Sequence, residues 1–173
     1  MKLRGAMLLC GVLFGGPAFA QLAPPIPQVE WFGGGSYYRL GISGGRNMVG
    51  WATALDYNLT KHVGVVLDFG GQYERFTGYT EANYQYLIGP QFKARRRRLT
   101  FFARGLAGGD AFHVPNSTRG GLAVGGGGGV DLSFGRIASI RLIQIDSLHN
   151  HFAGNWNHNV RVAAGVVFKF PRP

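Results

Sequence analysis

The segment Asn159–Phe170 reads NVRVAAGVVFKF and alternates between two kinds of side chain. Its even-numbered positions are apolar, whereas its odd-numbered positions are mostly small or charged. A period of two residues is typical of a β-strand whose two faces meet different surroundings. The same alternation over residues 48–58 and 63–73 makes this period the dominant pattern of the chain and predicts an all-β protein.

The composition of the less apolar face indicates what that face meets. A soluble β-sandwich turns a face rich in Lys, Glu, Thr and Ser toward water. Here the corresponding face carries Gly, Ala and single charges, which suits the narrow interior of a small barrel, while the apolar face would contact lipid. The alternative is a soluble barrel with its apolar residues inside around a hydrophobic ligand, which would leave a surface of Gly and Ala.

Applied to the whole chain, the pattern predicts an eight-stranded antiparallel up-and-down transmembrane β-barrel. Most predicted strands are close to the ~10 residues that a tilted transmembrane strand requires. The strands are Val29–Leu40, Met48–Asn58, Val63–Tyr73, Asn83–Lys93, Leu99–Gly108, Leu122–Phe134, Ile137–Asp146 and Asn159–Phe170.

The predicted connections alternate in length. The longer, polar ones are Gly41–Asn47, Glu74–Ala82, Gly109–Gly121 and Ser147–His158. The shorter ones are Leu59–His62, Ala94–Arg98 and Gly135–Arg136. Short turns on one rim and long outward loops on the other are the organisation of an outer-membrane barrel.

The 173-residue chain has room for one barrel domain and begins with a predicted export signal. A basic start, an apolar stretch and small residues before position 21 predict cleavage after Ala20. Since the only cysteine, Cys10, lies in that signal, we expect folding without disulfides. The expected segments are 1–20, signal peptide; 21–28, Pro-rich lead-in; 29–170, barrel; and 171–173, C-terminal tail.

Three segments resemble the small outer membrane protein β-barrel family, which is related to OmpA-like transmembrane domains within the porin-like superfamily. Asn155–Phe170 is similar to the family's closing strand, and residues 86–92 and 140–146 are similar to its fourth and seventh strands. The resemblance implies a Gram-negative-type outer membrane and insertion by the barrel-assembly machinery. Family members typically end on an aromatic residue, whereas here Pro171-Arg172-Pro173 follows Phe170.

Several charged residues fall on the predicted interior parity of their strands. A charge in a narrow, largely dry lumen is costly unless it is paired, so we expect an ionic plug. A small passive pore is the alternative. Arg141 is out of step with Asp146, so its strand either contains a bulge or turns Arg141 toward lipid. The lumen ion-pair candidates are Asp56, Asp68, Asp131, Asp146, Lys93, Arg104 and Arg161.

Aromatic residues gather at the predicted strand ends, where they would form two interfacial girdles. A run of four arginines, Arg95, Arg96, Arg97 and Arg98, marks a predicted turn, where it would face anionic headgroups or cell-wall polymer. Export argues against nucleic acid as the partner of this run. The girdle candidates are Trp51, Tyr57, Tyr73, Tyr84, Tyr86, Phe92 and Phe170.

No motif of the sequence predicts a cofactor, a metal site or a catalytic site. The glycine run 125–129 lacks the Lys-Ser/Thr of a phosphate-binding loop, and we expect it to allow strand curvature and close packing of a ring. Four histidines fall in predicted outer loops: His113, His149, His151 and His158. The loop that contains His149 and His151 has no carboxylate or cysteine that could complete a metal site. Some small barrels modify lipid A with a serine two residues after a histidine, but here Ser147 precedes His149.

The sequence therefore predicts a non-enzymatic, monomeric barrel of the bacterial outer membrane with a structural or surface-interaction role. Its expected partners are outer-membrane lipid and lipopolysaccharide, together with the insertion machinery. A passive pore is the first alternative function, and a lipid A-modifying enzyme is the second.

Overall fold

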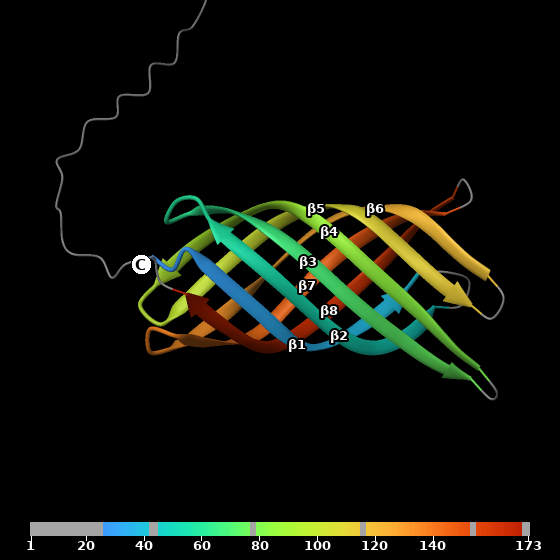
Figure 1. The fold of residues 1–173 in the computed structure, drawn as a ribbon, viewed down its shortest axis with the longest axis horizontal. Coiled ribbons are helices and arrows are strands. Elements are labelled where there is room, and N and C mark those ends of the chain that lie inside the picture. The colour runs from blue at the N-terminus through green and yellow to red at the C-terminus, as the bar shows by residue number, and fades with distance from the viewer. Residues whose placement is uncertain (1–25, 42–44, 77–78, 115–116, 153–154, 171–173) are drawn as a thin grey trace, which may run out of the picture.

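Eight antiparallel strands join edge to edge into one closed barrel (Figure 1). This computed structural model describes residues 26–41, 45–76, 79–114, 117–152 and 155–170, so the predicted signal peptide and C-terminal tail lie outside the described residues. The strands are β1 (Val29–Leu40), β2 (Arg46–Asn58), β3 (Val63–Phe76), β4 (Tyr79–Arg96), β5 (Leu99–Val114), β6 (Ser117–Phe134), β7 (Ala138–Phe152) and β8 (Asn155–Phe170). Each strand pairs with its neighbours in sequence and β8 closes on β1, so the predicted fold class is confirmed.

Among the described residues, no helix is long and apolar enough to cross a membrane.

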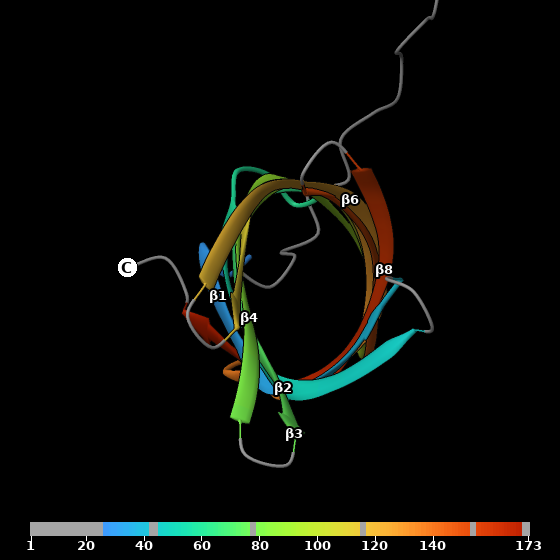
Figure 2. The same ribbon diagram turned by 90° about the vertical axis from the view of Figure 1, so that its right-hand side faces the viewer.

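The strands tilt strongly around the ring that Figure 2 shows. Following paired residues from Asn58 of β2 through β3 and onward around the barrel returns to β2 at Met48. Such an offset is the shear of a closed sheet, which goes with a strand tilt of about 35–45°. A barrel of eight strands leaves an interior that side chains fill, so the inward residues meet one another.

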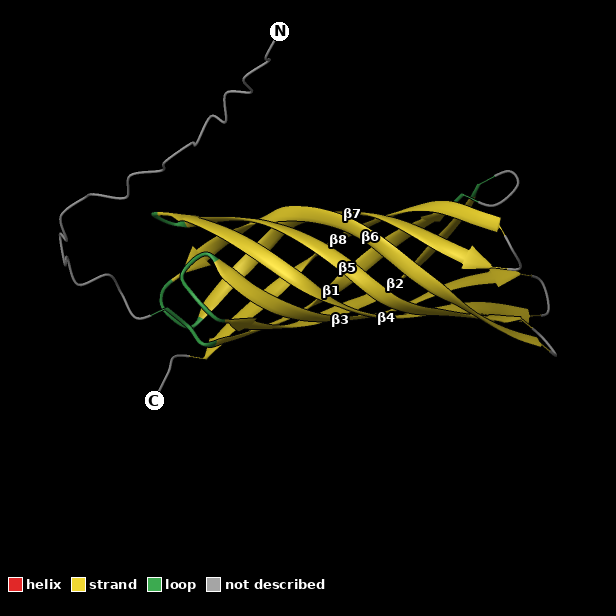
Figure 3. Cartoon of the chain, turned by 90° about the horizontal axis from the view of Figure 1, so that it is seen from above, coloured by secondary structure: helices red, strands yellow, loops and turns green. Residues whose placement is uncertain are grey.

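The connections between strands alternate between the two ends of the barrel. One end carries the turns after β2, β4 and β6 and the end of β8, and we call it the turn rim (Figure 3). Its turns use left-handed backbone at Gly135 and at Arg97. The other end carries the connections after β1, β3, β5 and β7, and we call it the loop rim.

The prediction of long polar loops was wrong, because the strands continue through most of their residues. In the predicted loop Gly109–Gly121, β5 runs to Val114 and β6 begins at Ser117. In the predicted loop Ser147–His158, β7 runs to Phe152 and β8 begins at Asn155. Beyond the apolar band, neither face of the sheet needs to be apolar, but the backbones of neighbouring strands can still pair. The strands therefore extend past the residues whose alternation predicted them.

The other two predicted long loops are also shorter than expected. Gly41–Asn47 shrinks to residues 41–45, and Glu74–Ala82 shrinks to residues 77–78, because β3 and β4 pair as far as Phe76 and Tyr79.

A β-bulge in β7 explains the position of Arg141. Val130 of β6 pairs with Ile143 and the next residue, Asp131, pairs with Arg141, so Leu142 is an extra residue in the ladder. Leu142 and Ile143 both face outward, whereas Arg141 is fully buried. Of the two interpretations of the sequence, the bulge is therefore the one observed.

Large apolar side chains cover the outside of the barrel wall. Exposed residues alternate with buried ones along most strands, as in the pattern of β3, and this matches the predicted parity. The exposed set includes Trp31, Leu55, Val65, Leu67, Phe69, Ile88, Phe101, Ile140, Ile145, Val166 and Phe168. An outward apolar band between two rims is the surface of a transmembrane barrel.

Glycines in β6 leave space for side chains that cross the lumen. Gly127 pairs with Arg104 on one side and with Asp146 on the other, and the side chains of these two residues meet. A Cβ at Gly127 would overlap Oδ1 of Asp146 and the carbonyl oxygen of Ile145. A Cβ at Gly129 would lie 2.7 Å from the ring of Phe102, which is the close ring packing expected for the glycine run.

We predict that Gly127→Ala destabilises the barrel, because the added methyl group must displace Asp146 or its backbone. Overpacking of this kind typically costs about 1–3 kcal/mol. Heat-modifiable gel migration of refolded protein should show unfolding at a lower temperature than for the parent chain. Gly105→Ala is the matched control, since a Cβ there meets nothing within 4 Å, and an equal loss in both variants would contradict the explanation.

Candidate functional site

Four charged side chains at the centre of the lumen form a closed ion-pair network, which we call the lumen quartet: Asp68, Asp146, Arg104 and Arg161. Arg104 reaches Asp68 at 3.0 Å and Asp146 at 2.8 Å, and Arg161 reaches the same two carboxylates at 2.7 and 3.0 Å. All four side chains are inaccessible to solvent. Two cations and two anions leave the quartet with no formal net charge, as buried ions require.

A second network fills the lumen near the turn rim. Lys93 bridges Glu30 at 2.7 Å and Asp56 at 3.1 Å, and Arg95 holds the other oxygen of Glu30 at 3.0 Å. The amide of Gln91 donates to Asp56 at 3.0 Å. The acids here are therefore paired with cations from the end of β4.

Arg141 completes the polar filling beside that network. Its guanidinium donates two hydrogen bonds to Asp131, at 2.8 and 3.1 Å, and a third to Gln144 at 2.7 Å. The guanidinium carbon also lies 4.3 Å from the ring centroid of Phe32 and 4.2 Å from that of Phe102. Cation–π contacts with the two rings stabilise a charge that water does not reach.

The structure places all the lumen candidates of the sequence inside the barrel, where each contacts an opposite charge. Sequence reasoning did not find Glu30 or the pairing of Arg141. It also missed the buried amides, although Gln91 and Gln85 share the parity of Lys93 and could have been found from it.

The lumen changes character near the loop rim. Asp110 is fully buried and has no salt bridge among the described residues. One of its carboxylate oxygens accepts hydrogen bonds from the side-chain amides of Asn83, Gln85 and Asn150. Neutral amide donors therefore replace cations at this level of the barrel.

Charges are segregated between the inside and the outside of the barrel. All eight acidic residues of the chain are buried or half-buried in the lumen or at its mouth. Glu74 and Glu81, at the mouth, are both held by Arg46 at 3.1 and 2.6 Å. Among the described residues, the exposed charged side chains are all basic: Arg39, Arg75 and Arg119 toward the loop rim, and Lys61, Arg96, Arg97, Arg98 and Arg136 at the turn rim.

The arginine run divides between these two regions. Arg95 is half-buried, where it contacts Glu30 and donates to the carbonyl oxygen of Lys61, so it belongs to the ion-pair network near the turn rim. Arg96, Arg97 and Arg98 are exposed around the turn between β4 and β5.

The predicted girdle aromatics face outward. Tyr57, Phe92 and Phe170 lie near the turn rim. Toward the loop rim, Nε1 of Trp51 donates to the hydroxyl of Tyr73 at 3.4 Å, and that hydroxyl donates to Tyr84 at the same distance. Tyr86 is exposed on the same wall, and its ring lies over Gly109.

The wall also carries aromatic residues that the prediction omitted. The ring of Trp31 stacks on that of Phe168, with 5.6 Å between the ring centroids.

A serine–histidine contact lies on the outer wall of β7 and β8. Ser147 Oγ and His158 Nε2 are 2.8 Å apart, and the ring of His149 lies 4.9 Å from that of His158. A serine nucleophile needs an acid or other group to orient its base and free donors for an oxyanion. The carboxylates of the chain all face the lumen, and the described His, Cys, Asp and Glu residues form no group of three or more that could hold a metal ion.

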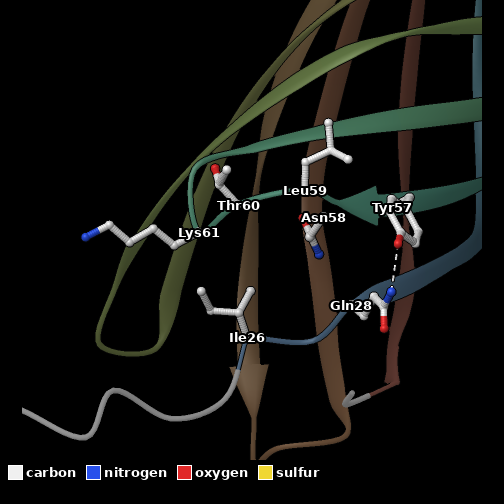
Figure 4. Close-up of a pocket in the computed structure, with 7 residues that line it drawn as sticks. All are labelled: Ile26, Gln28, Tyr57, Asn58, Leu59, Thr60 and Lys61. Atoms are coloured by element: carbon white, nitrogen blue, oxygen red, sulfur yellow. Dashed lines mark hydrogen bonds between the residues drawn. The ribbon is translucent and has the colours of Figure 1, made fainter. Parts of the chain in front are cut away.

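A small notch of about 200 Å³ lies at the turn rim (Figure 4). Gln28 donates to the hydroxyl of Tyr57 at 2.7 Å, and Oγ1 of Thr60 accepts from the backbone N–H of Val63 at 3.0 Å. Lys61 extends away from the other lining residues in this view. The bond of Gln28 therefore joins the segment before β1 to the end of β2, and the bond of Thr60 closes the β2–β3 turn on itself.

Solved structures similar to this fold include bacterial outer-membrane barrels. The Neisserial surface protein A matches with a TM-score of 0.64 and 11% identity over 83% of this chain and 97% of its own. The N-terminal β-barrel domain of Pseudomonas aeruginosa OprF gives 0.56 and 11%, over 83% and 98%. Ail, the attachment invasion locus protein of Yersinia pestis, gives 0.54 and 15%, over 83% and 99%.

No protein-family model matches the chain, and no curated protein sequence is detectably similar to it. The structural likeness shows that the chain has the fold of small bacterial outer-membrane β-barrels.

We predict that Asp146→Asn destabilises the barrel strongly, because Arg104 and Arg161 would then share one carboxylate. Removing one partner of a buried ion pair typically costs about 3–5 kcal/mol. Urea unfolding of the barrel in lipid should show this loss, whereas Arg136→Gln on the turn rim should change stability by less than about 0.5 kcal/mol.

The double variant Asp146→Leu/Arg104→Met tests the cause, since it leaves one cation facing Asp68. Its loss of stability should be smaller than the sum of the losses caused by Asp146→Leu alone and by Arg104→Met alone. Strict additivity would argue against a coupled quartet.

Proposed function

We propose that this protein is a non-enzymatic integral β-barrel of the bacterial outer membrane with a structural and surface-interaction role. Its lumen is sealed by internal ion pairs, and its rims bind anionic membrane lipid, with lipopolysaccharide as the partner at the loop rim. The observation that carries this proposal is the segregation of charge. Every acidic residue lies in the lumen or at its mouth, and the exposed charged side chains of the described residues are all basic.

Exposed bases on both rims favour anionic headgroups on both sides of a bilayer. Each Lys or Arg close to an anionic membrane surface contributes about 1 kcal/mol of attraction. The turn rim presents Arg96, Arg97, Arg98, Lys61 and Arg136 without a competing carboxylate among the described exposed residues. We assign the turn rim, where β1 begins and β8 ends, to the periplasmic side, as the expected insertion by the barrel-assembly machinery implies.

The packing of the lumen supports a sealed barrel in place of a passive pore. The pairs of Lys93 with Glu30 and Asp56 and of Arg141 with Asp131 fill the interior near the turn rim, and the quartet fills its centre. The side chains of all these pairs are at most 3% exposed. An ion that crossed would have to break these pairs in a low-dielectric space, at a cost of several kcal/mol per ion.

The outer wall supports a non-enzymatic role. Ser147 and His158 contact each other, but both lie within the β7–β8 ladder, where Ser147 pairs with Val160 and His158 pairs with His149. No described carboxylate faces their side of the wall to orient the histidine.

We predict that the folded barrel retains anionic lipid in preference to zwitterionic lipid. Barrel extracted from mixed vesicles of phosphatidylglycerol and phosphatidylcholine should carry phosphatidylglycerol in native mass spectra. High salt should reduce the preference, because screening shortens the range of exposed charges. The same vesicles supplied with lipid A should return it with its acyl chains intact, and a shortened product that Ser147→Ala abolishes would contradict the non-enzymatic role.

We also predict that purified barrel is electrically silent in planar bilayers. A stable, reproducible single-channel conductance would favour the passive pore. Asp146→Asn, which disrupts the quartet, is the informative comparison, because a sealed lumen should begin to conduct only when its pairing is broken.

A further inference from the structure

A groove of about 630 Å³ lies on the outer wall toward the loop rim, lined by Val49, Tyr73, Arg75 and Thr80. Val49 of β2 pairs with Tyr73 of β3, and Arg75 of β3 pairs with Thr80 of β4. The groove therefore crosses the three strands near their ends at the loop rim. We call it the Arg75 groove.

The chemistry of the Arg75 groove changes along the barrel axis. Because β3 runs toward the loop rim, Tyr73 lies nearer the apolar band and Arg75 lies further out. Val49, paired with Tyr73, is 64% exposed and continues the apolar surface. The groove therefore passes from the paired residues Val49 and Tyr73 to the guanidinium of Arg75 and the hydroxyl of Thr80 further out, which matches the direction along a membrane lipid from acyl chain to headgroup.

Neighbouring contacts fix the middle of the groove. The Tyr73 hydroxyl lies 3.4 Å from Nε1 of Trp51, which donates to it, and 3.4 Å from the hydroxyl oxygen of Tyr84, to which it donates. Aromatic rings of this kind sit at the level of headgroups in membrane barrels. The interface between acyl chains and headgroups therefore passes through the groove at Tyr73.

Arg75 has no ion pair with any described residue, and the acids nearest to it along the strands are already engaged. Glu74 points to the opposite face of β3 and is held by Arg46, which also holds Glu81. No described acid is exposed on the outer wall. The guanidinium is therefore available to an anion, and its planar fork matches the oxygens of a phosphate.

We propose that the Arg75 groove binds the phosphate-bearing headgroup of an outer-leaflet lipid, with an acyl chain against Val49. Arg75 donates to the phosphate oxygens, and the hydroxyl of Thr80 supplies a second polar contact. This inference rests on the proposed function, which places the loop rim at the outer leaflet. It adds one defined site to what is otherwise a general attraction of basic rims to anionic lipid.

The test compares Arg75→Gln with Arg119→Gln in the full folded barrel, titrated with diphosphoryl lipid A and read by native mass spectrometry. Arg119 is exposed toward the same rim but does not line the groove, so it is the matched control. Arg75→Gln should weaken lipid A binding by about tenfold or more, as expected for a lost charge-assisted hydrogen bond. Arg119→Gln should weaken it by less than about twofold, and Arg75→Lys should fall between the two because it keeps the charge but loses the fork.

The remaining outcomes separate the two proposals. Equal losses for Arg75→Gln and Arg119→Gln would refute the groove and leave general rim attraction intact. Displacement of lipid A by inorganic phosphate at similar concentration would also refute it, since the site would then recognise the free anion. A parent barrel that binds lipid A no better than phosphatidylcholine would overturn the proposed function itself.

Discussion

Neutralisation of charge inside the barrel is the constraint on which the rest of the structure depends. The quartet brings Arg104, Arg161, Asp68 and Asp146 together from four different strands, so it exists only when the barrel is closed. A single member left unpaired in that dry interior would cost more than most surface contacts can offset. The ionic filling therefore depends on closure of the wall, and the register of the strands must be one that brings these charges together.

The glycines of β6 are part of the same constraint. Along one row of paired residues, Gly127 lies between Arg104 and Asp146, and Asp146 lies beside Arg161. Arg104 reaches Asp146 across the strand that separates them because no side chain stands in the way. A glycine-rich strand, weak in its own packing, thus allows two charged neighbours to pair.

The sequence predicted the parts of the fold that depend on period-two alternation and missed those that depend on three-dimensional pairing. The strand count, the outward apolar face and the inward charges all follow from alternation, as in Asn159–Phe170. Glu30 was missed because both faces of β1 carry large aromatics, with Phe32 inside and Trp31 outside. The strand ends near the loop rim were missed because alternation stops there while the backbone still pairs, and the choice between a bulge and a lipid-facing Arg141 needed the partner strands.

The basic exterior is a consequence of the interior. The chain has eight acidic residues, and all of them lie in the lumen or at its mouth. No carboxylate is therefore left on the exposed surface to balance the basic residues there. The net positive charge of the protein therefore appears at the rims, where a bilayer presents its headgroups. In a soluble protein such a surface would have only counter-ions to balance it. Under the proposed function, the membrane would supply anions at the two levels where the bases lie, and sealing of the lumen and attraction of lipid would both result from one distribution of charge.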